Sequence, residues 1–139
     1  MELEAVAKIA VDCAYALYLD PGPGLLESVC EAAFAERLLR RGLSVESQGP
    51  VPAWVDSRKI EIAFRADLLV ENSLLVELKS IEALLPVHSK QTLTYLSLPN
   101  LSLGLFINFG APTFRQCVKR IVHNHRDTSG SDLRIHKPP

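Results

Sequence analysis

The sequence predicts an α/β fold, of the α+β kind, in which a mixed sheet is flanked by helices. Three observations support this prediction. Apolar residues recur at helical spacing along residues 2–18. Residues 60–79 contain two apolar runs around a short turn, which is typical of a β-hairpin. Residues 103–109 read LGLFINF, a nearly unbroken apolar run that favours a central strand covered on both faces. The predicted order of elements is α-α-β-β-β-β-α-β-α.

Proline and glycine mark where the predicted elements begin and end. The first helix stops before the turn-forming segment 20–24, DPGPG, and the second, 25–41, stops at Gly42. Pro50 and Pro52 indicate an edge strand or a bulge in the first hairpin. The remaining predicted elements are strands 43–48, 51–55, 60–70 and 74–79, a helix 87–97 after Pro86, a strand 103–109, and a helix from Pro112 through about His123.

The chain of 139 residues is long enough for one domain with its own core. We expect a single domain over residues 1–125 and a flexible tail over residues 126–139. No apolar run approaches the roughly 20 residues that cross a bilayer, so we expect no membrane partner. The acidic start and three widely spaced cysteines, without a CxxC pair, favour a cytoplasmic protein with reduced thiols.

The formal net charge of −1 does not by itself indicate a nucleic-acid-binding protein. Basic residues nevertheless gather at residues 37–41 and again at residues 115–126. Two interpretations of these clusters stay open. They form a basic rim for a nucleic acid, or they are solvated helix ends that the helix dipole favours.

Three ionisable residues lie in the otherwise apolar second hairpin: Asp67, Glu77 and Lys79. Because side chains alternate along a strand, a turn centred on Asn72 would pair position 67 with position 77. The two carboxylates would then lie directly opposite each other, on the face away from the core. The core face would carry the apolar set Ala66, Leu68, Val70, Leu74, Val76 and Leu78.

Two opposed carboxylates repel each other and, if partly buried, lose hydration, so another interaction must offset that cost. The residues leave three alternatives open. One acid raises the pKa of the other and keeps a proton. Arg65 and Lys79 form a ladder of salt bridges with the acids. Or a divalent cation binds the two carboxylates, with the backbone carbonyl of Leu78 as a third oxygen ligand.

The pattern Asp67-x(9)-Glu77-x-Lys79 on a hairpin, after an acidic helix and before another helix, resembles the motif of the PD-(D/E)XK nuclease superfamily. Within that superfamily the chain looks like a GxxExxY-type protein, a small prokaryotic family. The resembling segments are GLLESVCEAAF (24–34), SQGPVP (47–52), FRADLLVENSLLVELKSIEALLPVHSKQTLTYL (64–96) and GLFINFG (104–110).

This resemblance implies a restriction-endonuclease-like core and phosphodiester hydrolysis that depends on Mg²⁺ or Mn²⁺. Asp67, Glu77 and the carbonyl of Leu78 would hold the metal, which polarises the phosphate and activates water. Lys79 would position that water or stabilise charge on phosphorus. Glu27 matches the acidic residue of the superfamily's early helix and would be catalytic. Glu31, one turn later, is the weaker alternative.

Gln91 and Tyr95 lie four residues apart and therefore share one face of the third helix. They match a QxxxY element of some superfamily branches, which implies a role in binding substrate or supporting Lys79. The same spacing also fits a polar helix face with one packed tyrosine.

One departure from the family pattern leaves a second function open. Cys30 stands where the family motif ends in tyrosine. The alternative to an active nuclease is therefore a catalytically inactive module that keeps the nuclease fold to bind nucleic acid or protein. The expected partner is nucleic acid, DNA rather than RNA. Because the small chain leaves no room for a separate recognition domain, we also expect a homodimer.

Overall fold

The computed structural model describes residues 1–20, 26–81, 86–97 and 101–123, and within these ranges the side chains of 51–55, 62–64, 89, 94, 95 and 97 are outside the description. The predicted flexible tail, 126–139, lies outside the described residues. The elements are α1 (Leu3–Leu19), α2 (Glu27–Arg40), β1 (Val45–Val55), β2 (Arg58–Val70), β3 (Leu74–Lys79), α3 (Pro86–Ser97), β4 (Leu103–Asn108), α4 (Phe114–Cys117) and β5 (Val118–Val122).

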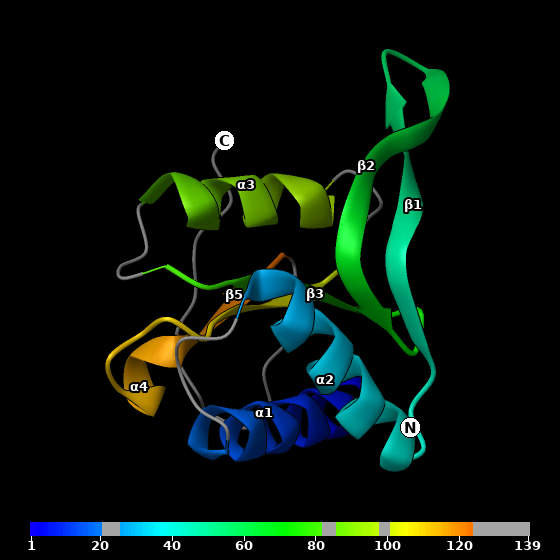
Figure 1. Cartoon of the computed structure of the whole chain (residues 1–139). Coiled ribbons are helices and arrows are strands. Elements are labelled where there is room, and N and C mark those ends of the chain that lie inside the picture. The colour runs from blue at the N-terminus through cyan, green and yellow to red at the C-terminus, as the bar shows by residue number, and fades with distance from the viewer. Residues whose placement is uncertain (21–25, 82–85, 98–100, 124–139) are drawn as a thin grey trace.

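Helices cover both faces of one five-stranded sheet, which confirms the predicted fold class (Figure 1). On one face, α1 and α2 bury apolar residues such as Val6, Phe34 and Leu38 against the sheet. On the other face, α3 packs Leu93 and Leu96 against a smaller core. Among the described residues, no helix has the length and apolar character needed to cross a membrane.

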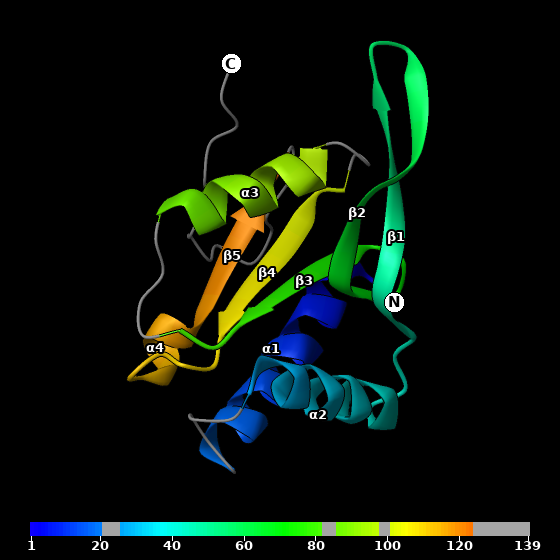
Figure 2. The same ribbon diagram turned by 45° about the horizontal axis from the view of Figure 1, so that its top comes forward.

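The sheet has the strand order β1-β2-β3-β4-β5 and is mixed. The β3–β4 pair is parallel, and α3 forms the connection between these strands, whereas the other pairs are antiparallel. All six residues of β4 are buried, as predicted for a central strand. Strands β1 and β2 continue past the sheet as a long two-stranded arm (Figure 2).

The second hairpin has the predicted register. Leu68 pairs with Val76 and Val70 with Leu74, and this ladder ends one residue before Asp67 and Glu77. Ala66 packs in the smaller core with Leu75 and not in the main core with Leu68, so the predicted single apolar face is not continuous through Asp67. Glu71 and Asn72 both take positive φ values of 53°, which form the tight turn. The prolines of β1 also behave as predicted, because β1 is an edge strand and its register shifts between Val51 and Ala53.

Two predicted elements are corrected by the structure. The predicted strands 43–48 and 51–55 are one continuous strand, β1, because the bulge absorbs the prolines without ending the pairing. The predicted last helix, from 112 through about 123, is a four-residue helix followed by β5. Pairing of β5 with the buried edge of β4 supplies the backbone with sheet hydrogen bonds, and this tertiary contact outweighs local helix propensity.

The three cysteines are free and buried, in agreement with the predicted reduced core thiols. Burial is the main cause that raises the pKa of Cys13 and of Cys30, and it raises the pKa of Cys117 to about 12. Thiols with raised pKa values are poor nucleophiles at neutral pH, so these residues have a packing role.

Candidate functional site

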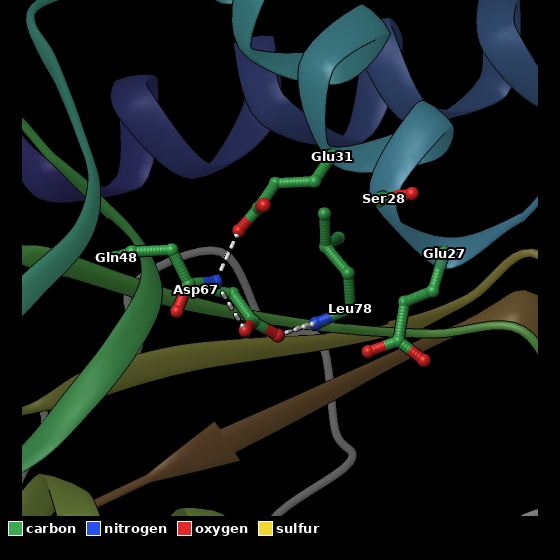
Figure 3. A pocket seen from close by; sticks show the side chains of 6 residues that line it. All are labelled: Glu27, Ser28, Glu31, Gln48, Asp67 and Leu78. Carbon is green, nitrogen blue, oxygen red and sulfur yellow. Dashed lines mark hydrogen bonds between the residues drawn. The ribbon is translucent and has the colours of Figure 1, made fainter.

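A pocket of about 300 Å³ opens between the first turns of α2 and the strands β1, β2 and β3 (Figure 3). Helix α2 begins at Glu27 and presents its first two turns to the sheet, while the strands present one residue each. The lining residues are Glu27, Ser28, Glu31, Gln48, Asp67 and Leu78. Acidic and polar side chains of α2, β1 and β2 thus converge beside Leu78 of β3.

Both oxygens of the Asp67 carboxylate accept hydrogen bonds. Oδ2 accepts from the backbone N–H of Leu78 at 2.8 Å, across the β2–β3 hairpin. Oδ1 accepts from the side-chain Nε2 of Gln48 at 3.1 Å, across the β1–β2 pair. The half-buried carboxylate is therefore held in one orientation by donors from both neighbouring strands.

Glu77 lies beside Asp67 and is the strongly perturbed acid of the pair. Its pKa is raised from 4.5 to about 8, first by loss of hydration on burial, then by the charge of Asp67 and a hydrogen bond with that residue. Lys79 lowers the pKa, but its effect is the weakest. The side-chain Oε1 of Glu77 is buried and has no hydrogen-bond partner.

These contacts bear on two of the three alternatives, the salt-bridge ladder and the retained proton. Among the described residues, no ion pair joins either acid to Arg65 or Lys79, so the salt-bridge ladder is not formed. Arg65 instead donates from Nη1 to the backbone carbonyl of Gln48 at 3.3 Å. The pKa of Glu77, raised to about 8 by burial and by the charge of Asp67, favours its protonated form at neutral pH, as in the first alternative.

The donor set fits a divalent cation. Asp67 and Glu77 are two adjoining carboxyl groups, and the buried Oε1 of Glu77 lacks a partner that a hard cation would supply. Leu78, which follows Glu77 in β3, lines the pocket, and its backbone N–H donates to Asp67. Within the described ranges, however, no three side chains of histidine, cysteine, aspartate or glutamate are grouped to hold a metal ion, so backbone oxygen and water would have to complete the coordination.

The end of β3, where Lys79 is half-buried, is fixed by the neighbouring strand β4. The carbonyl of Lys79 accepts a hydrogen bond from Phe109 N at 2.9 Å. The buried Asn108 accepts at Oδ1 from the backbone N–H groups of Ile81 and Gly110, each at 3.0 Å. A glycine is required here, since a Cβ on Gly110 would lie 2.4 Å from the carbonyl oxygen of Ile81.

The structure places both candidate acids of α2 in the pocket. Glu27, at the start of the helix, is exposed and points toward the strands (Figure 3). Glu31 is half-buried, and its Oε1 accepts a hydrogen bond from Nε2 of Gln48 at 2.7 Å. Through Gln48, Glu31 is thus the acid of α2 that is linked to Asp67.

Gln48 is a pocket residue that the sequence reasoning did not single out. The pairs Ser47–Leu68 and Gly49–Ala66 bracket it, so it lies opposite Asp67 in the β1–β2 ladder. Its backbone has a φ of 52°, which is unusual for a residue other than glycine. Extending the predicted hairpin register by one strand would have placed it beside Asp67, but the prolines obscured the continuity of β1.

The predicted helix pair belongs to α3. Gln91 is exposed on α3, which covers the opposite face of the sheet from α2, and it is not among the lining residues (Figure 1). Tyr95 belongs to α3, and its side chain lies outside the described residues. Their roles stay predictions.

Cys30 faces the core and not the pocket. It is 1% exposed and belongs to the main core beside Phe34. Glu27 and Glu31, which flank it along the helix, face the pocket instead. The predicted departure, Cys30 where the GxxExxY motif would have tyrosine, therefore lies at a packing position in this chain.

The two basic clusters differ in their setting. The arginines of 37–41 line a separate hollow of about 220 Å³ at the far end of α2. That end lies about 20 Å from Glu27, since a helix rises about 1.5 Å per residue. In the second cluster Arg120 pairs with Glu4 of α1, and His123 is buried.

Comparison with family models agrees with the geometry of fold and hairpin. The model of the PD-(D/E)XK nuclease superfamily matches residues 4–121, which spans most of the chain. The chain therefore belongs to the PD-(D/E)XK nuclease superfamily. Comparison with curated proteins and with solved structures gives no significant match.

Proposed function

We propose that this protein is a metal-dependent nuclease that hydrolyses phosphodiester bonds in DNA, and that it is of the GxxExxY type. The observation that supports this best is the contact between Asp67 and Glu77, in which the buried carboxyl oxygen Oε1 of Glu77 has no hydrogen-bond partner. Two adjoining carboxyl groups, of which Asp67 lines the pocket, are costly to the fold alone, and cation binding offsets such a cost.

In this proposal Asp67, Glu77 and the carbonyl of Leu78 hold Mg²⁺ or Mn²⁺. The bound cation would supply Lewis-acid activation of a phosphate oxygen and of water. Glu77 must give up its proton to bind, because metal ligands are deprotonated. The hydrogen bond from Leu78 N fixes Asp67 Oδ2 and leaves a second lone pair on that oxygen.

Lys79 and Glu27 are proposed to act on the reacting groups. Lys79 lies at the end of β3, two residues after Glu77, and its backbone is anchored to β4. Its ammonium group would stabilise the negative charge that develops on the phosphate. Glu27 is exposed at the pocket mouth, where its carboxylate would hold water. Gln91 and Tyr95 are proposed to contact the nucleic acid from α3.

The alternative is an inactive module that keeps the fold for binding nucleic acid or protein. One observation favours it: within the described part of the chain, no three metal-ligating side chains are grouped. Its nearly neutral charge also gives little long-range attraction to nucleic acid. For the active form we propose a cytoplasmic homodimer, in which the partner that helps to cut DNA is a second copy of the chain.

The direct test is cleavage of plasmid and of single-stranded DNA, with RNA as a third substrate, in the presence of Mg²⁺ or Mn²⁺. We expect wild type to cut DNA, and Asp67→Asn and Glu77→Gln to lose at least 100-fold in rate, since each removes a proposed metal ligand. Glu36→Gln, on the exposed side of α2, is the matched control and should keep full activity. Equal residual cleavage by all four proteins would point to a contaminant.

Calorimetric titration with Mn²⁺ separates the nuclease from the inactive module. A nuclease should bind the ion and melt at a higher temperature in its presence, because a ligand of the native state stabilises that state. Absence of heat and of any melting shift in wild type would support the module.

A further inference from the structure

The side chain of Gln48 bridges two carboxylates. Its Nε2 donates to Oε1 of Glu31 at 2.7 Å and to Oδ1 of Asp67 at 3.1 Å (Figure 3). These partners come from α2 and β2, while Gln48 comes from β1, so one side chain ties three elements together at the pocket wall.

The chemistry of the amide suits this position. An ionised carboxylate only accepts hydrogen bonds, and the amide nitrogen of glutamine carries two N–H donors. A single uncharged group can therefore satisfy Glu31 and Asp67 together and reduce their mutual repulsion. A glutamate at this position would add a third negative charge and remove both donors.

The backbone at Gln48 is held in a conformation that most residues avoid. Its φ of 52° lies in the left-handed region, and this costs free energy for a side chain with a Cβ. Arg65 donates from Nη1 to the carbonyl of Gln48 at 3.3 Å, which helps to hold that conformation. Glycine would relieve the backbone cost, so the presence of glutamine favours a role for its side chain.

We propose that Gln48 is a positioning residue for the metal ligand Asp67, and that Glu31 acts on the site through Gln48. This inference rests on the proposed metal-dependent function. With Oδ1 held by Gln48 and Oδ2 held by Leu78 N, the carboxylate is fixed in one orientation, and each oxygen keeps a lone pair for a cation. Groups of this kind, which orient a ligand without binding the metal, typically change metal affinity by about 10–100-fold.

The test measures Mn²⁺ affinity by isothermal titration calorimetry for wild type and Gln48→Gly. Glycine removes the amide and relaxes the backbone, so a fold defect is not expected, and circular dichroism with thermal unfolding checks it. We expect the dissociation constant for Mn²⁺ to rise by about tenfold or more. Ser57→Gly is the matched control, because Ser57 also has a positive φ, 61°, but lies at the exposed tip of the β1–β2 arm.

A double-mutant cycle tests whether Glu31 acts through Gln48. Glu31→Gln should weaken Mn²⁺ binding several-fold in the wild-type background and have little further effect in Gln48→Gly, because coupled residues are not additive. Additive losses would overturn this part of the proposal, since Glu31 would then act without the amide.

The remaining outcomes separate the inference from the function on which it rests. If wild type binds Mn²⁺, Asp67→Asn does not, and Gln48→Gly binds as wild type or more tightly, the positioning role is wrong while the metal site stands. If neither wild type nor any variant binds Mn²⁺, the metal-dependent function fails and the positioning role fails with it.

Discussion

The carboxylate of Asp67 accepts a hydrogen bond from the backbone N–H of Leu78 at 2.8 Å. This contact ties the acidic residue of β2 to the one residue that separates Glu77 from Lys79 on β3. All three predicted hairpin residues are thereby fixed relative to each other by the backbone of the sheet. The geometry of the site depends on the hairpin register. Substitutions that alter this register should therefore change both the free energy of unfolding and the affinity for metal.

The raised pKa of Glu77 predicts a pH-dependent stability in the metal-free protein. Folded Glu77 keeps its proton up to a pKa of about 8, whereas the unfolded chain loses it near 4.5. Between these values the folded state binds more protons, so the free energy of unfolding falls as pH rises. The Glu77→Gln variant does not titrate at this position, so at pH 8 its free energy of unfolding should exceed that of wild type by about 2 kcal/mol. The full effect would be roughly 1.4 kcal/mol for each unit of the pKa difference, and the smaller value is expected because the residue is half-buried.

Urea denaturation in a chelator at pH 5, 6.5 and 8 measures this difference. The two proteins should be nearly equal in stability at pH 5 and diverge as pH increases. Parallel stability curves for wild type and Glu77→Gln would show that Glu77 is ionised throughout.

Gly110→Ala should destabilise the protein by about 2 kcal/mol, within the usual cost of overpacking. The added Cβ would meet backbone atoms of Ile81 at 2.4–2.8 Å, and backbone cannot move aside as a flexible side chain does. Thermal unfolding measures the loss. Gly104→Ala is a suitable comparison, since its nearest neighbours are side-chain atoms of Leu96 at 3.3 Å. An equal effect of both changes would contradict the tight contact with Ile81.

Cys30→Tyr, which introduces the tyrosine of the proposed GxxExxY type, should lower stability and leave the pocket chemistry unchanged. Cys30 is 1% exposed in the main core, where a larger ring costs about 1–3 kcal/mol unless neighbours repack. Chemical denaturation and the Mn²⁺ dissociation constant are the two measurements. A substantial gain in cleavage or in Mn²⁺ affinity would show instead that the tyrosine hydroxyl contributes to the site.

Glu4→Gln should cost about 1.5–3 kcal/mol, the range for hydrogen bonds to charged groups. The carboxylate of Glu4 pairs with Arg120 where both side chains are largely buried, and this pair joins α1 to β5. Glu36→Gln, in the exposed pair with Arg40, should change stability by at most about 0.5 kcal/mol. Similar losses in both variants, compared by urea denaturation, would contradict a special role for the buried pair.

The sequence was most informative where a local rule acts alone. The turn at Asn72, the apolar run of β4 and the end of α2 at Gly42, with its φ of 83°, could all be predicted from neighbouring residues. The same alternation predicted that Asp67 would lie opposite Glu77. The last helix was wrongly predicted, because pairing of residues 118–122 with β4 depends on a contact that no local pattern reveals.

The pocket itself followed from the sequence only in part. Its hairpin residues were predicted from the alternation of side chains along a strand and from the resemblance to the nuclease superfamily. Glu27 was predicted from that resemblance alone. The hydrogen bonds of the Gln48 amide were not predicted, because its partners Glu31 and Asp67 lie 17 and 19 residues away in sequence.

The hairpin and its turn could be predicted from the sequence, because side-chain alternation and turn residues are local properties of a strand. The pKa of Glu77 and the hydrogen bonds around Asp67 depend on the tertiary structure. Burial and the nearby Asp67 raise the pKa of Glu77, and packing of α2 over the sheet brings Glu31 within reach of Gln48. The hydration of these side chains and the distances between them are set by the folded chain. The chemistry of Asp67, Glu77 and Lys79 therefore depends on the fold and not on the local sequence.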